Sequence, residues 1–582
     1  MKRLIILGFA LLFILPGLTA QRLTEFSEEP NAFIKELREF MTSSKRKTME
    51  ELFDNFEKVF KSGRFSPEEF KMIRATSNMM LSQRMTASPY FSKYLLALAI
   101  VKDGELGETR FKEWHRILDH LLANIENRKL KPFERFLEFS QAFFERNAFR
   151  YSRTGTTWIA DGPRYDFEIE DNKPVVKYDK LNLIATRGKD SIMIQETSGR
   201  YYPVEEIWRG QGGKVTWERY GLNKDVYAEL GEYELQTNKS LYEVKSVKMH
   251  YPLYFGDLAV PGSFRDKLSA ANRASEGSYP RFESHEEILE IKNIGQGVKY
   301  TGGFRLHGMT VYGFGSKENK ARILIYNDDN ELAYRGRAEL FTIRREERIV
   351  GERVESTVYF GQDSLYHPSV NIRFEIPTKQ LQLSRGQRGS DRNPFYNSLH
   401  QVNIDANNID YHLATDSIYI GKTNLGFQKT LTPVSFESLK YFELGDYQRI
   451  QNIATTNPIA LMKIASRENG GKRTLDANEL AKRLNPRFTV ENVSSLLYDL
   501  VSKGFINYDA DKQEVELKDK IFHYADAALK KVDYDVLRIT SETTGTNAVF
   551  DLKDQTIWIN GVKHIELSAL QKVGFLPKNN QI

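Results

Sequence analysis

The feature that most constrains this chain is a change of hydrophobic period near Tyr151. From about Asn31 to Arg150, apolar residues recur at the 3.6-residue spacing of amphipathic helices. Beyond Tyr151 they alternate with polar residues at the two-residue period of strands. Helices and strands bury different subsets of positions, so one pattern cannot serve both. We therefore expect a multidomain α+β protein, with helices first and strands second.

Residues 21–150 are expected to form an α-helical bundle of five or six antiparallel helices. Phe33, Leu37 and Met41 belong to one apolar stripe, and Ser66–Glu69 reads as a capping box with Pro at the first helical position. Stripes of Phe and Met can line a ligand groove, but this spacing is more typical of a core.

Residues 151–452 are expected to form a long β-rich array. Short alternating runs are separated by Gly, Asn and Asp turns, and an Asp-Ser pair precedes a strand at Asp190, Asp363 and Asp416. The region is too long for an ordinary sandwich, which favours stacked strands. A β-solenoid and an elongated jelly-roll, of the kind used by lipopolysaccharide-transport proteins, both remain open because the repeats are too degenerate to define a period.

Helical spacing returns in residues 453–530, where three helices are followed by a hairpin. The segment Thr474–Leu517 resembles winged-helix domains in this order of elements. Its third helix would present Glu491 and Asp499, with Lys503 as its only basic residue, so it would repel the phosphates of DNA. We therefore expect an inserted winged-helix-like domain for structure or protein contact, and no nucleic-acid partner. Residues 531–582 are expected to be a C-terminal β segment that continues the array or is cut short.

The first 20 residues have the layout of a secretory signal peptide. A basic start at Met1–Arg3 precedes an apolar run, Leu4–Leu15, and Leu18-Thr19-Ala20 stands before Gln21. The run is shorter than the ~20 residues needed to span a bilayer. We expect Sec-dependent export and cleavage after Ala20. The mature protein would lie in the periplasm, at the outer-membrane periphery or outside the cell, without a transmembrane span.

Composition excludes several kinds of chemistry. The chain has no Cys, which excludes disulfides, thiolate metal sites and cysteine nucleophiles, and its formal net charge of +5 gives no global attraction to nucleic acid. The ten histidines have no metal-ligand spacing; His115 and His120 are five residues apart and point about 140° away from each other on a helix. The chain also lacks a Gly-x-Ser-x-Gly elbow and a phosphate loop. We expect neither a metal nor a cofactor.

One basic loop is a candidate ligand site. Arg385, Arg388 and Arg392 lie within eight residues of one another, close to Tyr396. Arginines in this density can clamp an anionic glycan or a lipid headgroup through bidentate hydrogen bonds, although a solvated turn is the simpler interpretation.

Two further sets of residues have a functional and a structural interpretation. Stacked strands could align Asp190, Asp363 and Asp416 as acid/base groups or cation ligands, but Asp before a strand more often caps a turn. An aromatic set could form a sugar-stacking strip, or it could belong to the core. Its members are Trp158, Tyr201, Tyr202, Trp208 and Trp217.

Several segments together resemble those of large uncharacterised exported proteins of Bacteroidota. These segments are Gly302–Gly308, Tyr312–Gly315 and Asn393–His400, in a chain with a helical front and a signal peptide ending Ala-Gln. The resemblance implies a cell-envelope protein. It does not indicate which residues have a functional role.

Our leading hypothesis is a non-enzymatic envelope or secreted protein whose β array is a scaffold or binding surface, with an envelope protein or a glycan as partner. The alternative is a polysaccharide-acting enzyme with a β-helical core that uses Asp and Arg side chains on one face. Exposed Asp, Arg and aromatic side chains in one groove would favour the enzyme. Buried aromatics and dispersed charge would favour the scaffold.

Overall fold

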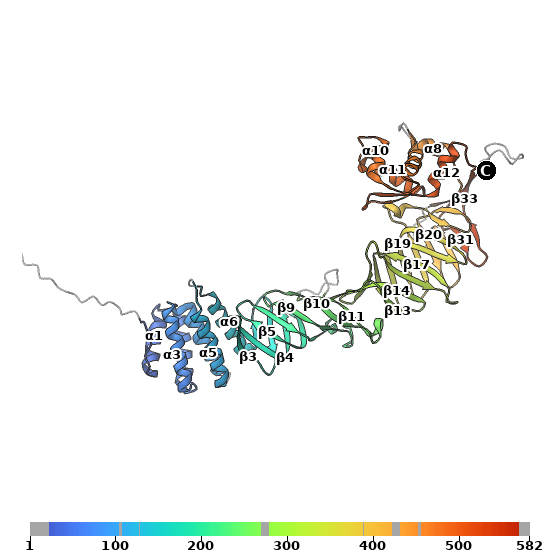
Figure 1. Ribbon diagram of the computed structural model, residues 1–582. Helices are drawn as coiled ribbons and strands as arrows, with labels where there is room; N and C mark the ends of the chain where they lie inside the picture. The colour runs from blue at the N-terminus through green and yellow to red at the C-terminus, as the bar shows by residue number, and fades with distance from the viewer. Residues whose placement is uncertain are drawn as a thin grey trace, which may run out of the picture. The chain divides into compact units, whose positions relative to one another are not determined.

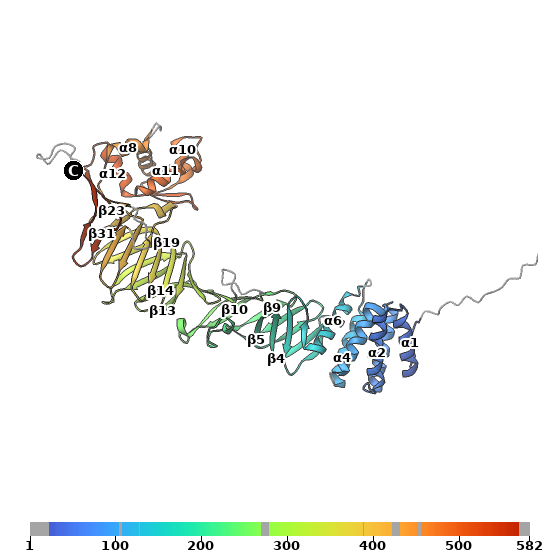
Figure 2. The ribbon, with the colours of Figure 1, turned by 180° about the vertical axis from the view of Figure 1, so that it is seen from behind.

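The computed structural model describes residues 23–103, 107–126, 129–268, 279–387, 389–421, 431–451 and 456–569. Helices come first, a large antiparallel β array follows, and a second group of helices lies near the C-terminus, which confirms the expected mixed α+β class (Figure 1, Figure 2). The chain packs as two compact units. One contains Met1–Val215, Leu230–Val244 and Lys267–Asn272; the other contains Thr216–Glu229, Lys245–Asp266 and Arg273–Ile582. The strands that we expected in one array are thus divided between two units.

The described part of the first unit begins with helices. They are α1 (Pro30–Thr42), α2 (Lys47–Lys61), α3 (Pro67–Ser82), the π-helical turn η1 (Ala87–Phe91), α4 (Ser92–Asp103), α5 (Glu108–Ala123) and α6 (Lys131–Arg146). The capping box at the start of α3 is confirmed: the Glu69 N–H donates to Ser66 Oγ at 3.2 Å, and the Ser66 N–H donates to Glu69 Oε2 at 2.8 Å. Asn147 ends α6 in a left-handed conformation, and strands begin at the next residue.

Two long strands organise the sheet that follows. The strands are β1 (Ala148–Arg150), β2 (Thr157–Asp161), β3 (Asp166–Glu170), β4 (Lys173–Arg187), β5 (Asp190–Tyr202), β6 (Ile207–Gln211), β7 (Lys214–Thr216) and β9 (Glu232–Gln236). β4 and β5 pair along their length, with a register shift on either side of Leu181. The first half of β4 also pairs with β3 and the second half with β2, so one long strand serves two small groups of strands.

The remaining elements outside the second helical group are mostly strands. They are η2 (Glu218–Tyr220), β8 (Tyr227–Leu230), β10 (Leu241–His250), α7 (Pro252–Phe255), β11 (Ala259–Lys267), β12 (Arg281–Ser284), β13 (Leu289–Gly295), β14 (Val298–His307), β15 (Thr310–Phe314), β16 (Ala321–Tyr326), β17 (Leu332–Ala338), β18 (Leu340–Arg344), β19 (Arg348–Phe360), β20 (Asp363–Glu375), β21 (Gln380–Ser384), η3 (Gly389–Arg392), β22 (Phe395–Asn397), β23 (Val402–Asp405), β24 (Asn408–His412), β25 (Ser417–Gly421), β26 (Thr432–Ser438), β30 (Asp535–Thr543), β31 (Thr546–Asp551), β32 (Thr556–Ile559) and β33 (Val562–Ala569).

In the second unit, three long strands, β14, β19 and β20, are shared by two strand series. Sheet A runs β13-β14-β16-β17-β19-β20-β22-β23-β26-β30-β33. Sheet B runs β12-β14-β15-β18-β19-β20-β21-β24-β25-β31-β32. All of these ladders are antiparallel. Their inward side chains alternate with outward ones, as in a strand with one buried face.

The glycine cluster at residues 302–315 makes room for a buried tyrosine. Tyr300 is 1% exposed, and its hydroxyl donates to the Gly303 carbonyl at 2.6 Å. A Cβ atom at Gly313 would lie 2.4 Å from the Tyr300 ring, closer than van der Waals contact allows. The glycines on these neighbouring strands therefore have a packing role.

The second helical group is inserted between β26 and β30, which pair with each other. It contains α8 (Leu444–Gln451), α9 (Pro458–Glu468), β27 (Thr474–Asp476), α10 (Ala477–Leu484), α11 (Val490–Ser502), β28 (Ile506–Asp509), β29 (Glu514–Leu517) and α12 (Asp519–Ala528). We call residues 440–530 the insert. It has its own apolar core, and it begins with α8, before the boundary that we expected at residue 453. Because β31 pairs with β25 and β30 pairs with β26, the C-terminal strands continue the array.

Candidate functional site

One row of side chains crosses the outer face of sheet A. Cross-strand partners lie on the same face of a sheet, so the register aligns residues from ten strand segments that are far apart in sequence. In order, the partners are Lys299, Leu324, Arg335, Thr357, Tyr366, Tyr396, Asn403, Glu437, Arg538 and Glu566. The alternation of buried Tyr334 with half-exposed Arg335 on β17 shows that this row points outward.

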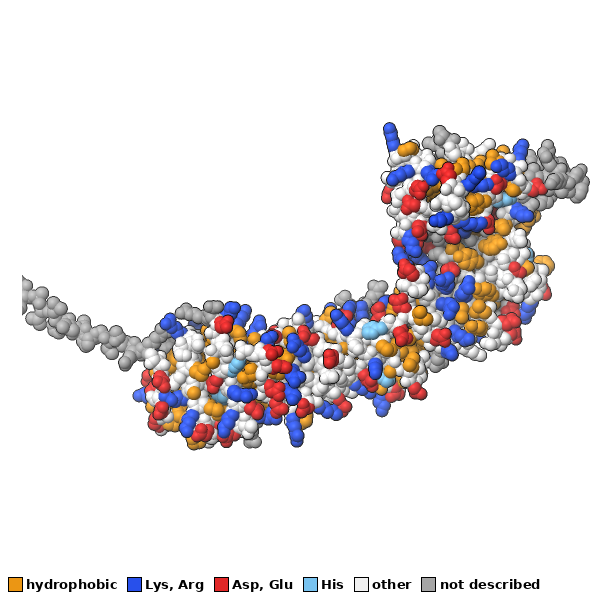
Figure 3. Space-filling view, in the orientation of Figure 1, with side chains coloured by type: hydrophobic (Ala, Val, Ile, Leu, Met, Phe, Trp, Pro, Cys, Tyr) orange, Lys and Arg blue, Asp and Glu red, His pale blue; other side chains and the backbone are white. Residues whose placement is uncertain are grey.

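The first half of this region is basic and aromatic. Cations from β14, β16 and β17 lie beside half-buried tyrosines. We call this set the basic face. It consists of Lys299, Arg322, Arg335, Arg337, Tyr326 and Tyr359. The Lys299 ammonium lies 4.6 Å from the Tyr326 ring centroid, and the Arg335 guanidinium lies 5.6 Å from that of Tyr359. In Figure 3, Lys and Arg side chains lie beside hydrophobic ones on the visible side of the second unit. Such a face can bind anions through its cations.

The insert covers the second half of the row. Burial, together with the nearby carboxylates of Glu355 and Glu516, raises the pKa of Tyr366 to about 12. Burial also raises the pKa of Tyr396, with a contribution from Asp519 of the insert. These two tyrosines thus lie close to carboxylates of the insert, which would repel an anionic ligand.

A charged cluster joins the insert to the last strands of sheet A. Arg538 lies 3.0 Å from Glu437, and the carboxylates of three further residues surround it: Asp446 at 3.4 Å, Glu566 at 3.5 Å and Glu443 at 3.6 Å. Burial alone would lower the pKa of Arg538, but Glu437 and its neighbours raise it above its ordinary value. Two further cations share these carboxylates, Lys520 on Glu437 and Arg449 on Asp446. We therefore interpret the cluster as an anchor rather than an acid/base site.

Two arginines of the predicted clamp, Arg385 and Arg392, lie within the described residues. Arg385 is 13% exposed; it pairs with Asp405 at 2.7 Å and donates to the Asn393 carbonyl at 3.1 Å. Arg392 is exposed, Tyr396 lies in the row described above, and Arg388 is outside the described residues. The Arg385 side chain is thus engaged by its own loop and by β23.

The same loop is a contact point for the insert. Ser390 Oγ donates to the Tyr508 carbonyl at 3.1 Å, and the Lys518 ammonium donates to Asn393 Oδ1 at 2.5 Å. Burial lowers the pKa of Lys518 to about 8. Nothing in the sequence indicated these partners, because each pair is more than 100 residues apart.

Behind this loop, a serine, a histidine and an aspartate lie close together. Ser369 Oγ donates to Asp391, whereas His367 Nε2–H donates to the Asn393 carbonyl at 2.7 Å and Nδ1 accepts the Ser369 backbone N–H at 3.0 Å. Burial lowers the pKa of His367 to about 3. Both ring nitrogens are occupied, so neither can take the proton of the serine hydroxyl as a catalytic triad requires. The group is a buried hydrogen-bond network.

The three Asp-Ser aspartates lie in three separate hairpins. Asp190 begins β5 opposite Arg187, Asp363 begins β20 and accepts a hydrogen bond from Ser398 Oγ at 2.8 Å, and Asp416 has a positive φ of 51° in the turn before β25. The described residues contain no group of three or more His, Cys, Asp or Glu side chains that could hold a metal ion.

The aromatic strip interpretation is wrong. Trp158, Trp208 and Trp217 are at most 1% exposed, and Tyr201 and Tyr202 are also buried. Because they are buried, these rings belong to the packing of the protein and are not open to a sugar.

The two histidines of α5 also do not converge. His115 is buried: Nε2 accepts the Tyr94 hydroxyl at 2.9 Å, Nδ1–H donates to the Phe111 carbonyl at 3.2 Å, and burial lowers its pKa to about 3. His120 lies on the surface, with Nε2 3.4 Å from the Asn172 carbonyl.

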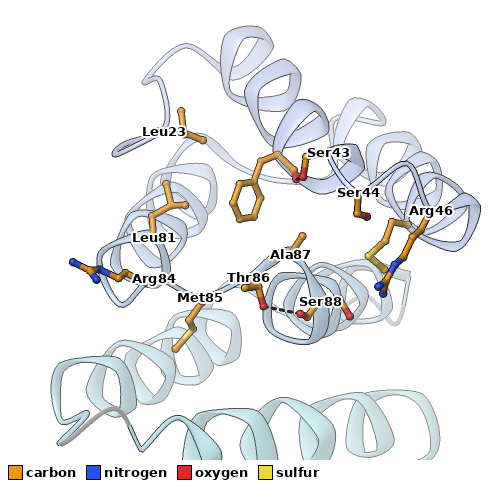
Figure 4. A pocket seen from close by; sticks show the side chains of 12 residues that line it. Leu23, Ser43, Ser44, Arg46, Leu81, Arg84, Met85, Thr86, Ala87 and Ser88 are labelled. Atoms are coloured by element: carbon orange, nitrogen blue, oxygen red, sulfur yellow. Dashed lines mark hydrogen bonds between the residues drawn. The ribbon is translucent and has the colours of Figure 1, made fainter. Parts of the chain in front are cut away.

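A cavity of about 400 Å³ lies among α1, α2, α3 and η1 (Figure 4). It is lined by Leu23, Phe40, Ser43, Ser44, Arg46, Met49, Leu81, Arg84, Met85, Thr86, Ala87 and Ser88. Thr86 Oγ1 donates to the Ser88 carbonyl at 2.6 Å, and Arg84 extends away from the space between the helices. Its polar groups do not converge on a common point, as those of a small-molecule site would.

No family model matches the chain, and no curated protein or solved structure matches it. Among the described residues, no helix is long and apolar enough to cross a membrane. Function is therefore inferred from the geometry of the chain itself.

Proposed function

We propose that this protein is a non-enzymatic exported scaffold that binds a partner on the surface of its β array. The proposal rests on the outer face of sheet A. The insert lies over the second half of its row, whereas the basic face, which includes Lys299 and Arg335 of the first half, presents cations to solvent. Antiparallel ladders hold these side chains in a rigid pattern without a flexible loop. A rigid surface of this kind binds without losing much conformational freedom.

Export is part of the proposal. It is supported by the basic, apolar and small-residue order of residues 1–20. The likeness of Gly302–Gly308 and Asn393–His400 to exported Bacteroidota proteins favours the cell envelope. N-terminal sequencing of the exported protein should find Gln21 as the first residue, and a mature chain that begins at Met1 would contradict export.

We further propose that the array is an elongated jelly-roll-like structure and that the insert is a winged-helix-like contact domain. Two strand series that share three long antiparallel strands support the first, because the coils of a β-helix pair in parallel. The element order of α9, α10, α11 and the β28–β29 hairpin supports the second. Its hairpin is used for contact within the chain, since Tyr508 accepts a hydrogen bond from Ser390.

The enzyme alternative has less support. It requires Asp and Arg side chains in one groove, whereas Asp190, Asp363 and Asp416 each lie in a different hairpin and Arg385 is paired with Asp405 of β23. Incubation with a panel of polysaccharides should release no reducing ends. Depolymerisation by the wild-type chain that disappears in a folded Asp190→Asn/Asp363→Asn/Asp416→Asn variant would contradict the scaffold and support the enzyme.

A further inference from the structure

The basic face carries more positive charge than its own carboxylates neutralise. Four cations, Lys299, Arg322, Arg335 and Arg337, lie on three neighbouring strands. Among the described residues, an acid pairs with only one of these cations: Glu355 lies 3.6 Å from Arg337. Arg322 is exposed and forms no ion pair with any residue in the described ranges. The remaining charge is open to an anionic ligand.

We propose that the basic face binds a linear acidic polysaccharide, a chain of carboxylate-bearing sugars; this deepens the proposed function and rests on it. Neighbouring strands are about 4.8 Å apart, and alternate residues on one strand are about 7 Å apart. Arg335 and Arg337 are alternate residues of β17, and Arg322 lies opposite Arg337 on β16. The spacing between these cations is therefore close to the length of one sugar residue. Each arginine guanidinium can form two parallel hydrogen bonds with a carboxylate.

The tyrosines argue against single-stranded nucleic acid. Bases bind such surfaces by stacking on open aromatic rings. On this face, the ring of Tyr326 lies below Lys299 and the ring of Tyr359 below Arg335. The rings support the cations and are not open platforms, so the ligand is recognised by its charge.

The insert sets one end of the site. Glu516 lies near Tyr366, where it contributes to the raised pKa of that tyrosine, and Asp511 pairs with Lys317 at 3.3 Å. Acidic side chains on the β28–β29 hairpin would repel a polyanion that continued along the row. The ligand is therefore confined to β14, β16, β17 and β19.

The test is the affinity of the full chain for polygalacturonate at low salt, measured by titration calorimetry. Arg322→Gln/Arg335→Gln should bind about tenfold more weakly, because two cations in contact with the ligand are lost. The matched control is Arg344→Gln/Arg373→Gln, which removes the same charge from exposed arginines paired with Glu347 and Glu375 and should change the affinity less than about twofold.

A gain-of-affinity variant separates binding from folding. Glu355→Gln removes the carboxylate that pairs with Arg337 and should tighten binding, a result that misfolding cannot produce. Equal affinity of the two double variants, or the absence of binding by the wild type, would overturn the polysaccharide site and leave the scaffold standing. Tighter binding of a single-stranded oligonucleotide or of anionic lipid vesicles would also overturn it. Cleavage of bound polygalacturonate would instead overturn the non-enzymatic function.

Discussion

Two regions of this protein use the same arrangement, a buried lysine that pairs with a glutamate over two aromatic rings. In the helical bundle, the Lys102 ammonium donates to Glu69 at 2.5 Å and lies over Phe65 and Phe111. In the insert, Lys520 pairs with Glu437 of β26 and lies over the rings of Phe505 and Tyr524.

The surroundings of the two pairs differ. Glu69 has one cationic partner among the described residues, whereas Glu437 also pairs with Arg538 at 3.0 Å. The first pair holds two helices of one bundle together, and the second holds the insert on the array. The difference indicates that loss of one buried cation should be costly in the bundle and tolerated at the insert.

The largest effect is expected from Lys102→Met. It leaves the Glu69 carboxylate buried without a cation, which should cost the helical bundle about 3–5 kcal/mol. Hydrogen exchange of peptides from α3 and α4 measures this loss region by region. Adding Glu69→Gln should restore much of it, because Gln can still close the capping box. If the double variant is no more stable than Lys102→Met, the unpaired Glu69 carboxylate is not the cause of the lost stability.

The second effect is acid sensitivity of the bundle. The pKa of folded His115 is about 3, below the ordinary value of 6.5, so the unfolded chain binds the proton first as pH falls. The stability contributed by this histidine should be constant above pH ~6.5 and fall by about 1.4 kcal/mol per pH unit down to pH ~3. Exchange of α5 amides at pH 7 and pH 5 measures it. His115→Gln should flatten this dependence; an unchanged slope would mean that His115 is not the titrating group.

A smaller effect is expected from Lys520→Met. Glu437 keeps Arg538 as a partner, so the variant should cost about 1–2 kcal/mol, mainly for the lost hydrogen bond to the Lys503 carbonyl. Exchange of α12 peptides reports the cost. A loss as large as that of Lys102→Met would show that Arg538 does not compensate for the lysine.

The smallest effect is expected from single Asp→Asn changes at positions 190, 363 and 416. These carboxylates lie in hairpin turns, where Asn supports the same backbone conformation, so each change should cost between a few tenths of a kcal/mol and ~1 kcal/mol. Thermal melts of the three variants measure this. A cost above that range would mean that loss of a charge is destabilising even in a turn. Burial would then not explain the larger loss of stability expected for Lys102→Met.

Local structure was predictable from the sequence because its causes lie within a few residues. The capping box at Ser66 depends on the residue three positions later, and the change from helix to strand near Tyr151 follows from spacing alone. The return of helices and the β28–β29 hairpin followed for the same reason. The aromatic strip failed because alternation identifies two faces of a strand without saying which is buried.

By itself, the sequence determined the order of helices and strands, the turns at Asp190, Asp363 and Asp416, and the absence of cysteine chemistry. Only the tertiary structure decided which side chains meet. The row from Lys299 to Glu566 depends on the register of successive strand pairs, one of which joins Glu437 to Arg538. The engagement of Arg385 and His367 with Asn393 depends on how one loop folds back. Short-range patterns carry propensity and capping, whereas register and burial arise from packing between distant segments, which no local pattern encodes.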